Sequence, residues 1–148
     1  MNKEAAQQPV KILLVDDEPA DQELTLMILS KLDFPTTVAC VADGEEALEY
    51  LYKHKHFANA ATPDLILLDL NMPKIDGKEV LLKIKVDPLL KNIPIIVLTT
   101  FDAEPEIVAT NLRHANYYLR KPLGIADFKR VADTINEIWL SLSNSNSN

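Results

Sequence analysis

Short apolar runs alternate along the chain with stretches that have the spacing of amphipathic helices. Most of these runs are apolar on successive residues or rich in β-branched residues, which is typical of strands buried in a parallel sheet. The expected strands are ILLV (12–15), TTVACV (36–41), LILLD (65–69), IIVLTT (95–100) and YYLRKP (117–122), the last stopped by Pro122. The segment 52–64 loses this periodicity and is expected to be a loop.

The stretches between the runs predict helices that cover the sheet. Pro19 suits a first helical turn with Asp17 as a cap, Asp43 suits the cap of a second helix, and Gly77 opens a third. The expected apolar stripes are Leu24, Met27, Ile28 and Leu32; Ala47, Leu48 and Leu51; Val80, Leu81 and Ile84; and Ile125, Phe128, Val131, Ile135, Ile138 and Leu142, with a further helix over about 103–113.

Five β-α repeats of this kind predict an α/β protein with a doubly wound, five-stranded parallel sheet and right-handed crossovers. We expect one domain over residues 10–142, with a disordered arm at 1–9 and a low-complexity, disordered tail at 143–148.

The composition narrows the class of protein further. The chain has 148 residues, of which 47% are hydrophobic, and a net charge of −7, which argues against binding to nucleic-acid phosphates. Cys40 is the only cysteine, so no disulfide forms within the chain, and a reducing compartment is expected. With no signal-peptide pattern and no apolar run long enough to span a bilayer, we expect a cytoplasmic protein without a membrane partner.

Polar residues stand at the carboxyl ends of the expected strands, the edge where ligands bind in such sheets. Asp16 and Asp17 follow the first strand, Asp69 ends the third, Thr99 lies at the end of the fourth, and Lys121 lies at the end of the fifth. Three carboxylates close together repel one another, and a hard cation such as Mg²⁺, which prefers oxygen ligands, relieves that repulsion.

The loop after Asp69 adds to this site. A backbone carbonyl there completes a set of oxygen ligands, and Asn71 is well placed to supply it. A cation beside a carboxylate is a natural seat for a phosphoryl group, with Lys121 as a point charge and Thr99 as a hydroxyl donor to its oxygens.

The motifs LLVDDEP, LILLDLNMPKIDG, IIVLTT and YYLRKP together resemble the receiver domain of two-component response regulators, over about residues 10–140. The resemblance implies the flavodoxin-like strand order 2-1-3-4-5 with five flanking helices. By position, the resemblance implies that Asp69 is the phospho-accepting aspartate and that Asp16 and Asp17 are the acidic magnesium pair, with a backbone carbonyl of Asn71 as a further ligand. It implies that Lys121 binds the phosphoryl group. Thr99 would be the switch hydroxyl and Tyr118 the aromatic switch residue. The family often has a cis bond before the proline after that lysine, so the bond between Lys121 and Pro122 is a candidate.

A narrower resemblance is to phytochrome-associated single-domain response regulators. It rests on the long loop at 52–64, the connection KVDPLLKNIP, the doubled TT and the ending EIWL. It implies a histidine kinase of phytochrome type as phosphodonor. The signal would leave through the face made by the fourth helix, the fifth strand and the last helix. Because Trp139 and Leu140 lie near the chain end, we expect a homodimer through that face.

Three other functions compete with a phosphorylation switch. Phosphatases of the haloacid dehalogenase type place a second aspartate two residues after the nucleophile, where this chain has Asn71, which cannot shuttle protons. We therefore expect a switch and not an enzyme. A scaffold with a degenerate site usually lacks an acidic residue or the lysine, and a nucleotide-binding protein often has a Gly-rich loop, which the three separated glycines of this chain do not form.

Overall fold

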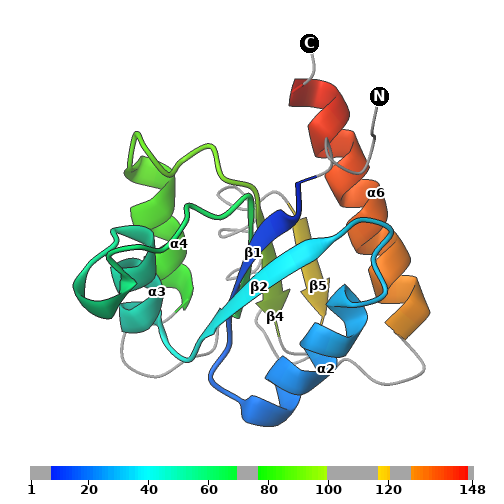
Figure 1. The fold of residues 1–148 in the computed structure, drawn as a ribbon, viewed down its shortest axis with the longest axis horizontal. Helices are drawn as coiled ribbons and strands as arrows, with labels where there is room; N and C mark the ends of the chain where they lie inside the picture. Colours follow the sequence, from blue (N-terminus) through cyan, green and yellow to red (C-terminus); the bar gives the residue numbers. More distant parts are fainter. Residues whose placement is uncertain (1–7, 70–76, 100–116, 121–127, 147–148) are drawn as a thin grey trace.

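The computed structural model describes residues 8–69, 77–99, 117–120 and 128–146. A parallel sheet with strand order β2-β1-β3-β4-β5 lies at its centre (Figure 1). The strands are β1 (Val10–Val15), β2 (Thr36–Val41), β3 (Leu65–Asp69), β4 (Ile95–Thr99) and β5 (Tyr117–Arg120). The helices are α2 (Pro19–Leu29), α3 (Gly44–Leu51), α4 (Gly77–Val86) and α6 (Phe128–Asn146), with a short 3₁₀ helix at Lys55–Phe57. The doubly wound α/β fold and its strand order are confirmed.

The two central strands are buried along nearly their whole length. In β1 only Lys11 is exposed, and all five residues of β3 are buried. The register pairs Ile12 with Leu65 and Val15 with Leu68, so both strands end at the same edge of the sheet. Continuous apolar strands are the sequence signature of a sheet that is covered on both faces.

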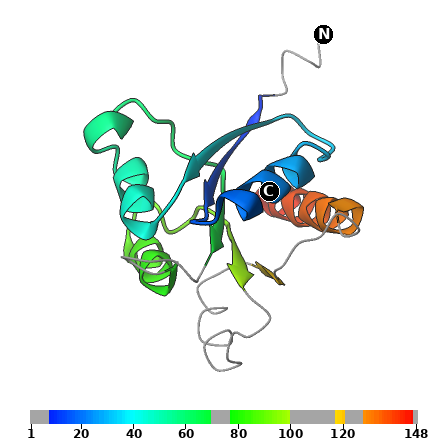
Figure 2. The ribbon, with the colours of Figure 1, turned by 90° about the horizontal axis from the view of Figure 1, so that it is seen from below.

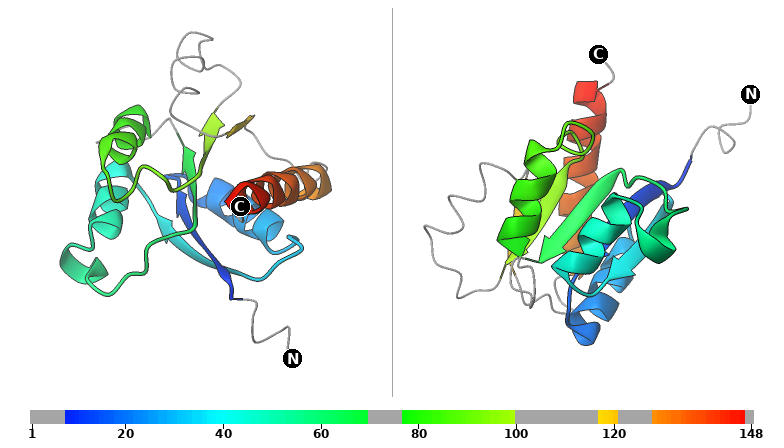
Figure 3. Two further views of the ribbon diagram at one scale, coloured as in Figure 1. Left: turned by 90° about the horizontal axis from the view of Figure 1, so that it is seen from above. Right: turned by 90° about the vertical axis from the view of Figure 1, so that its left-hand side faces the viewer.

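Helices cover both faces of the sheet. Helices α3 and α4 lie side by side on one face, and α2 and α6 lie on the other (Figures 2 and 3). Alternate residues of each strand therefore enter different cores. The α3/α4 core includes Leu13, Val15, Ile66, Leu68, Ile95 and Val97, whereas the α2/α6 core includes Ile12, Leu14, Leu65, Leu67, Ile96 and Leu98.

Helix α2 begins differently from the expectation. Its cap is Glu18, whose carboxylate accepts a hydrogen bond from the Ala20 backbone N–H at 3.3 Å, so the expected cap at Asp17 is wrong. Pro19 occupies the first helical turn as predicted. Capping by Glu18 keeps Asp17 out of the helix start and at the end of β1.

Helix α3 begins and ends in recognisable capping motifs. Asp43 accepts a hydrogen bond from the Glu46 N–H at 2.8 Å, which confirms the predicted cap. At the other end, the Lys53 N–H donates to the Tyr50 carbonyl and the His54 N–H donates to the Glu49 carbonyl. These two bonds form a Schellman motif, in which Lys53 has the left-handed conformation (φ 60°) that glycine usually takes.

Two further expectations need correction. The segment 52–64 is not wholly a loop, because the 3₁₀ helix Lys55–Phe57 lies within it, with the Phe57 ring against Tyr50. Met27 is 50% exposed and lies off the buried face of α2, which is made by Thr25, Ile28 and Leu29. This face is set by packing against α6 and the sheet, which spacing alone does not reveal.

The last helix anchors one side of the molecule. Its residues Val131, Ile135 and Ile138 are buried as predicted, and the helix continues to Asn146, beyond residue 142, where we expected the domain to end. Trp139 is partly buried and its ring lies 5.9 Å from that of Phe34. The expected helix at 103–113 and Ile125 lie outside the described residues. Among the helices described, none is long and apolar enough to cross a membrane.

Candidate functional site

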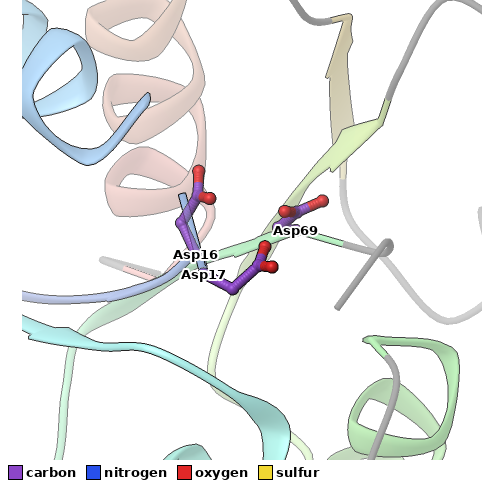
Figure 4. A group of neighbouring side chains, drawn as sticks. All are labelled: Asp16, Asp17 and Asp69. Carbon is purple, nitrogen blue, oxygen red and sulfur yellow. The ribbon is translucent and has the colours of Figure 1, made fainter. Parts of the chain in front are cut away.

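Three carboxylates meet where β1 and β3 end. Asp16 and Asp17 follow the last residue of β1, and Asp69 is the last residue of β3 (Figure 4). Each contributes one carboxylate oxygen to a group whose members lie within 4.8 Å of one another. The sequence-based expectation that these three side chains converge is confirmed.

The three carboxylates differ in their exposure. Asp16 and Asp69 are 0% and 3% exposed, whereas Asp17 is exposed. Two buried anions beside a third are costly unless a positive charge compensates them. The donor set consists of carboxylate oxygens with one side open to solvent, which is the chemistry of a hard divalent cation that keeps several waters. The residues present therefore fit a divalent cation.

Backbone contacts hold Asp16 in place at the end of β1. Its N–H donates to the Val41 carbonyl at 3.1 Å, and its Oδ1 accepts from the Glu18 N–H at 3.0 Å. The side-chain amide of Gln22, one turn into α2, donates a hydrogen bond to the Asp16 carbonyl oxygen. Together these bonds fix the turn that carries Asp16 and Asp17.

Sequence reasoning missed Glu18 and Gln22. Both act through backbone atoms of the turn, so they carry no chemical signature of a ligand. The sequence feature that could have identified them is a polar side chain at the start of a helix that directly follows a pair of aspartates at a strand end.

The negative charge of the site affects a cysteine on the neighbouring strand β2. Partial burial raises the pKa of the Cys40 thiol, and the negative charge of Asp16 raises it further. Cys40 is exposed in the neighbouring strand, so it is accessible to reagents but stays protonated at neutral pH.

Of the other predicted site residues, the structure describes the backbone positions of Thr99 and Tyr118. Thr99 ends β4, the strand that pairs with β3, and the register sets Asp69 beside Leu98. Tyr118 lies within β5, paired with Val97. Asn71, Lys121 and Pro122 lie outside the described residues, Lys121 directly after the end of β5.

Comparison with known proteins places this geometry in a family. Residues 12–133 match the model of the response regulator receiver domain. The chain belongs to the response regulator receiver domain family. The acidic group at the ends of β1 and β3 is thus part of a receiver domain, and the expected family is confirmed.

Receivers similar to this chain include phytochrome response regulators. Response regulator Rcp1 of Synechocystis is 39% identical over 132 residues, covering 89% of this chain and 90% of Rcp1. The structure of the phosphorylated cyanobacterial phytochrome response regulator RcpA has 44% identity and a TM-score of 0.80, covering 90% of this chain and 96% of RcpA. The Mn²⁺-bound structure of Rcp1 has a TM-score of 0.79 at 39% identity, covering 89% of this chain and 95% of that one.

A relative named for a different process has the same sequence identity to this chain as Rcp1. The probable methanogenesis regulatory protein FilR2 of Methanothrix harundinacea is 39% identical over 140 residues, covering 95% of this chain and 90% of FilR2. Overall identity therefore does not distinguish the stimulus that a receiver of this type serves.

Proposed function

We propose that this receiver accepts a phosphoryl group on Asp69 from a phosphohistidine of a histidine kinase, with Mg²⁺ as the bound cation. The observation that carries the proposal is the group of three carboxylates within 4.8 Å, in which Asp69 is 3% exposed at the end of a buried strand. The family match and the phosphorylated structure of RcpA support it.

In the proposed reaction an oxygen of the Asp69 carboxylate attacks phosphorus and the phosphorus–nitrogen bond breaks. The electron pair returns to the imidazole of the donor, and the product is an acyl phosphate on Asp69. Asp16, Asp17 and Asp69 would hold the cation, with the backbone carbonyl of Asn71 as a further ligand. When bound, the cation supplies positive charge that lowers the repulsion between Asp69 and the incoming phosphoryl oxygens.

The roles proposed for the remaining residues concern the transferred group. Lys121 pairs with a phosphoryl oxygen and the Thr99 hydroxyl donates to another. Tyr118 turns inward after Thr99 moves, which changes the face made by the helix expected at 103–113, β5 and α6. The pairing of β4 with β5 supports this coupling, because Tyr118 lies opposite Val97 and Thr99 is two residues farther along β4.

The proposal also names the donor kinase, the oligomeric state and the cellular compartment. The donor is a phytochrome-type kinase, which the similarity to Rcp1 and RcpA supports. The phosphorylated form dimerises through the face that includes α6, where Leu140 is 59% exposed. The reaction takes place in the cytoplasm, in keeping with a chain whose single cysteine, Cys40, has a free thiol.

Intact mass after incubation with acetyl phosphate and Mg²⁺ tests the central step. We expect one phosphoryl adduct in the native chain, and none without Mg²⁺ or in Asp69→Asn. An adduct that persists in Asp69→Asn would place the phosphoryl group elsewhere. If neither acetyl phosphate nor a phosphorylated kinase labels the native chain while Mg²⁺ is bound, the proposal fails and a scaffold role replaces it.

A further inference from the structure

Large apolar side chains are exposed on α4 and on the connection that follows it. Leu82 is 45% exposed, Val86 76% and Leu89 88%. Leu82 and Val86 are four residues apart, so they lie on one face of the helix, one turn above the other. The buried face of α4 is made by Val80, Leu81 and Ile84.

A fourth large side chain, that of Tyr52, is added to this group because it lies near Asp87. The Asp87 carboxylate accepts a hydrogen bond from the Leu89 N–H at 2.8 Å. Burial raises the pKa of the Tyr52 hydroxyl, and the same carboxylate lies close enough to Tyr52, which follows α3, to raise that pKa further. Tyr52 is 39% exposed, so its ring is part of the molecular surface. Tyr52, Leu82, Val86 and Leu89 therefore form one surface, which we call the α4 patch.

The connection that presents Leu89 is held in a fixed shape. The Lys85 ammonium donates to the carbonyl oxygens of Lys91 at 3.2 Å and Ile93 at 3.3 Å. Leu90 and Ile93 are buried beneath it. A surface that is already ordered loses little conformational entropy when it binds a partner, so the patch is suited to docking.

The charge around the patch is opposite to that of the chain. Residues 77–93 hold four lysines and two carboxylates, a net charge of +2, whereas the whole chain carries −7. Lys83 and Lys91 are exposed there, and Lys53 is exposed beside Tyr52. A partner that covers the patch is therefore favoured when it carries carboxylates around an apolar centre.

The patch is remote from the acidic site. The strands are parallel, Asp69 ends β3, and the connection after α4 leads into the first residue of β4. The patch thus lies toward the opposite end of the sheet, as the position of the connection above α4 in Figure 1 shows. A partner bound there leaves the three carboxylates accessible.

We propose that the α4 patch docks an amphipathic helix of another protein, whose apolar stripe is flanked by carboxylates, and that docking does not depend on phosphorylation. The apolar stripe covers Leu82, Val86 and Leu89, and the carboxylates pair with the surrounding lysines. Two copies of this chain meeting patch to patch would instead bring their lysines together, which disfavours a second copy as the occupant.

Two synthetic peptides of roughly 18 residues, about five helical turns, test the proposal on the full chain. Both carry the same leucine stripe, with glutamates flanking it in one peptide and lysines in the other. Amide chemical shifts of the ¹⁵N-labelled protein are followed during titration. We expect the glutamate peptide to shift Tyr52, Leu82, Val86 and Leu89, and the lysine peptide to leave them unmoved.

Variants then separate apolar contact from charge. The exposed double variant Val86→Ser/Leu89→Ser should bind the glutamate peptide at least about tenfold more weakly, whereas Leu26→Ser, at an exposed leucine on α2, should bind as the native chain. Lys83→Glu/Lys91→Glu should also weaken binding, and Lys31→Glu far less. The native chain should bind the glutamate peptide equally before and after incubation with acetyl phosphate and Mg²⁺, and the double serine variant should still be phosphorylated on Asp69, which keeps this proposal distinct from the preceding one.

Several outcomes overturn the proposal. These are equal binding of the two peptides, shifts on another surface, and native affinity in the double serine variant. Concentration-dependent self-association in sedimentation velocity that Val86→Ser/Leu89→Ser abolishes would assign the patch to a second copy instead.

Discussion

The side chain of Asn136 on α6 accepts a hydrogen bond from the backbone N–H of Asp33, 103 residues earlier, at 2.9 Å. Asn136 is buried, 6% exposed, and lies one turn before Trp139, which contacts Phe34. The last helix is therefore fixed to the connection between α2 and β2 by a polar contact as well as by apolar packing.

Asn136→Ala should lower the free energy of unfolding by about 1–3 kcal/mol, because it leaves the Asp33 N–H without its acceptor in a partly buried position. Urea denaturation followed by circular dichroism measures this loss. Thr134→Ala is the matched control, since it removes a bond to the Arg130 carbonyl within the same helix and should cost far less. Equal losses in the two variants would contradict the role of the contact between α6 and the connection.

Gln22→Met should weaken Mg²⁺ binding by about fivefold, the effect of losing roughly one net hydrogen bond. Methionine has a similar length but donates no hydrogen bond to the Asp16 carbonyl, so the turn carrying Asp16 and Asp17 is less restrained. Isothermal titration calorimetry measures the affinity directly. Met27→Ala, an exposed change on the same helix, should leave it unchanged, and an unaltered Kd in Gln22→Met would show that the turn needs no such restraint.

Lys53→Gly should raise the free energy of unfolding by about 0.5–1 kcal/mol, because glycine takes the left-handed conformation of Lys53 without steric cost. Part of the gain is lost to the greater entropy of glycine in the unfolded chain. Thermal unfolding detects the change. Lys53→Ala keeps the β-carbon and should give no gain, so stabilisation by both variants would trace the effect to the lysine side chain instead.

Alkylation of Cys40 should depend on pH in a direction set by its surroundings. A raised thiol pKa means less thiolate at a given pH, so iodoacetamide should react more slowly with the folded chain than with the urea-unfolded chain. The rate should rise with pH toward the raised pKa. Asp16→Asn removes the smaller of the two causes and should move the midpoint of the pH profile modestly downward, whereas an upward movement would contradict the assigned charge effect.

Residues with chemistry at strand ends were predictable, whereas residues that shape the turns were not. The convergence of Asp16, Asp17 and Asp69 was predictable for two reasons. Buried strands can be recognised in the sequence as apolar runs, and the carboxyl ends of parallel strands lie at one edge of the sheet. Gln22 and Lys53 could not be foreseen. Gln22 acts on a carbonyl whose direction depends on the folded turn, and Lys53 adopts a conformation that its residue type disfavours.

The exposure of Met27 illustrates a second limit. Helical spacing identifies positions that share a face, but α6 and the sheet decide which face is buried, and these lie far away in the sequence. Asn136 depends on the same long-range packing. The expected roles of Thr99 and Lys121 followed from their places at strand ends and that of Asn71 from the loop after Asp69, whereas the role of Tyr118 came from resemblance to the family alone.

The division of the apolar interior into two cores has a consequence for synthesis of the chain on the ribosome. The acidic group is complete once residue 69 has been made, and the α3/α4 core needs nothing beyond β4 among the residues described. The α2/α6 core, in contrast, lacks Val131, Ile135 and Ile138 until the final helix emerges. A nascent chain that stops short of this helix thus carries its acidic group beside a sheet face that, among the described helices, α2 alone covers. Such chains should need chaperones most during the last steps of translation.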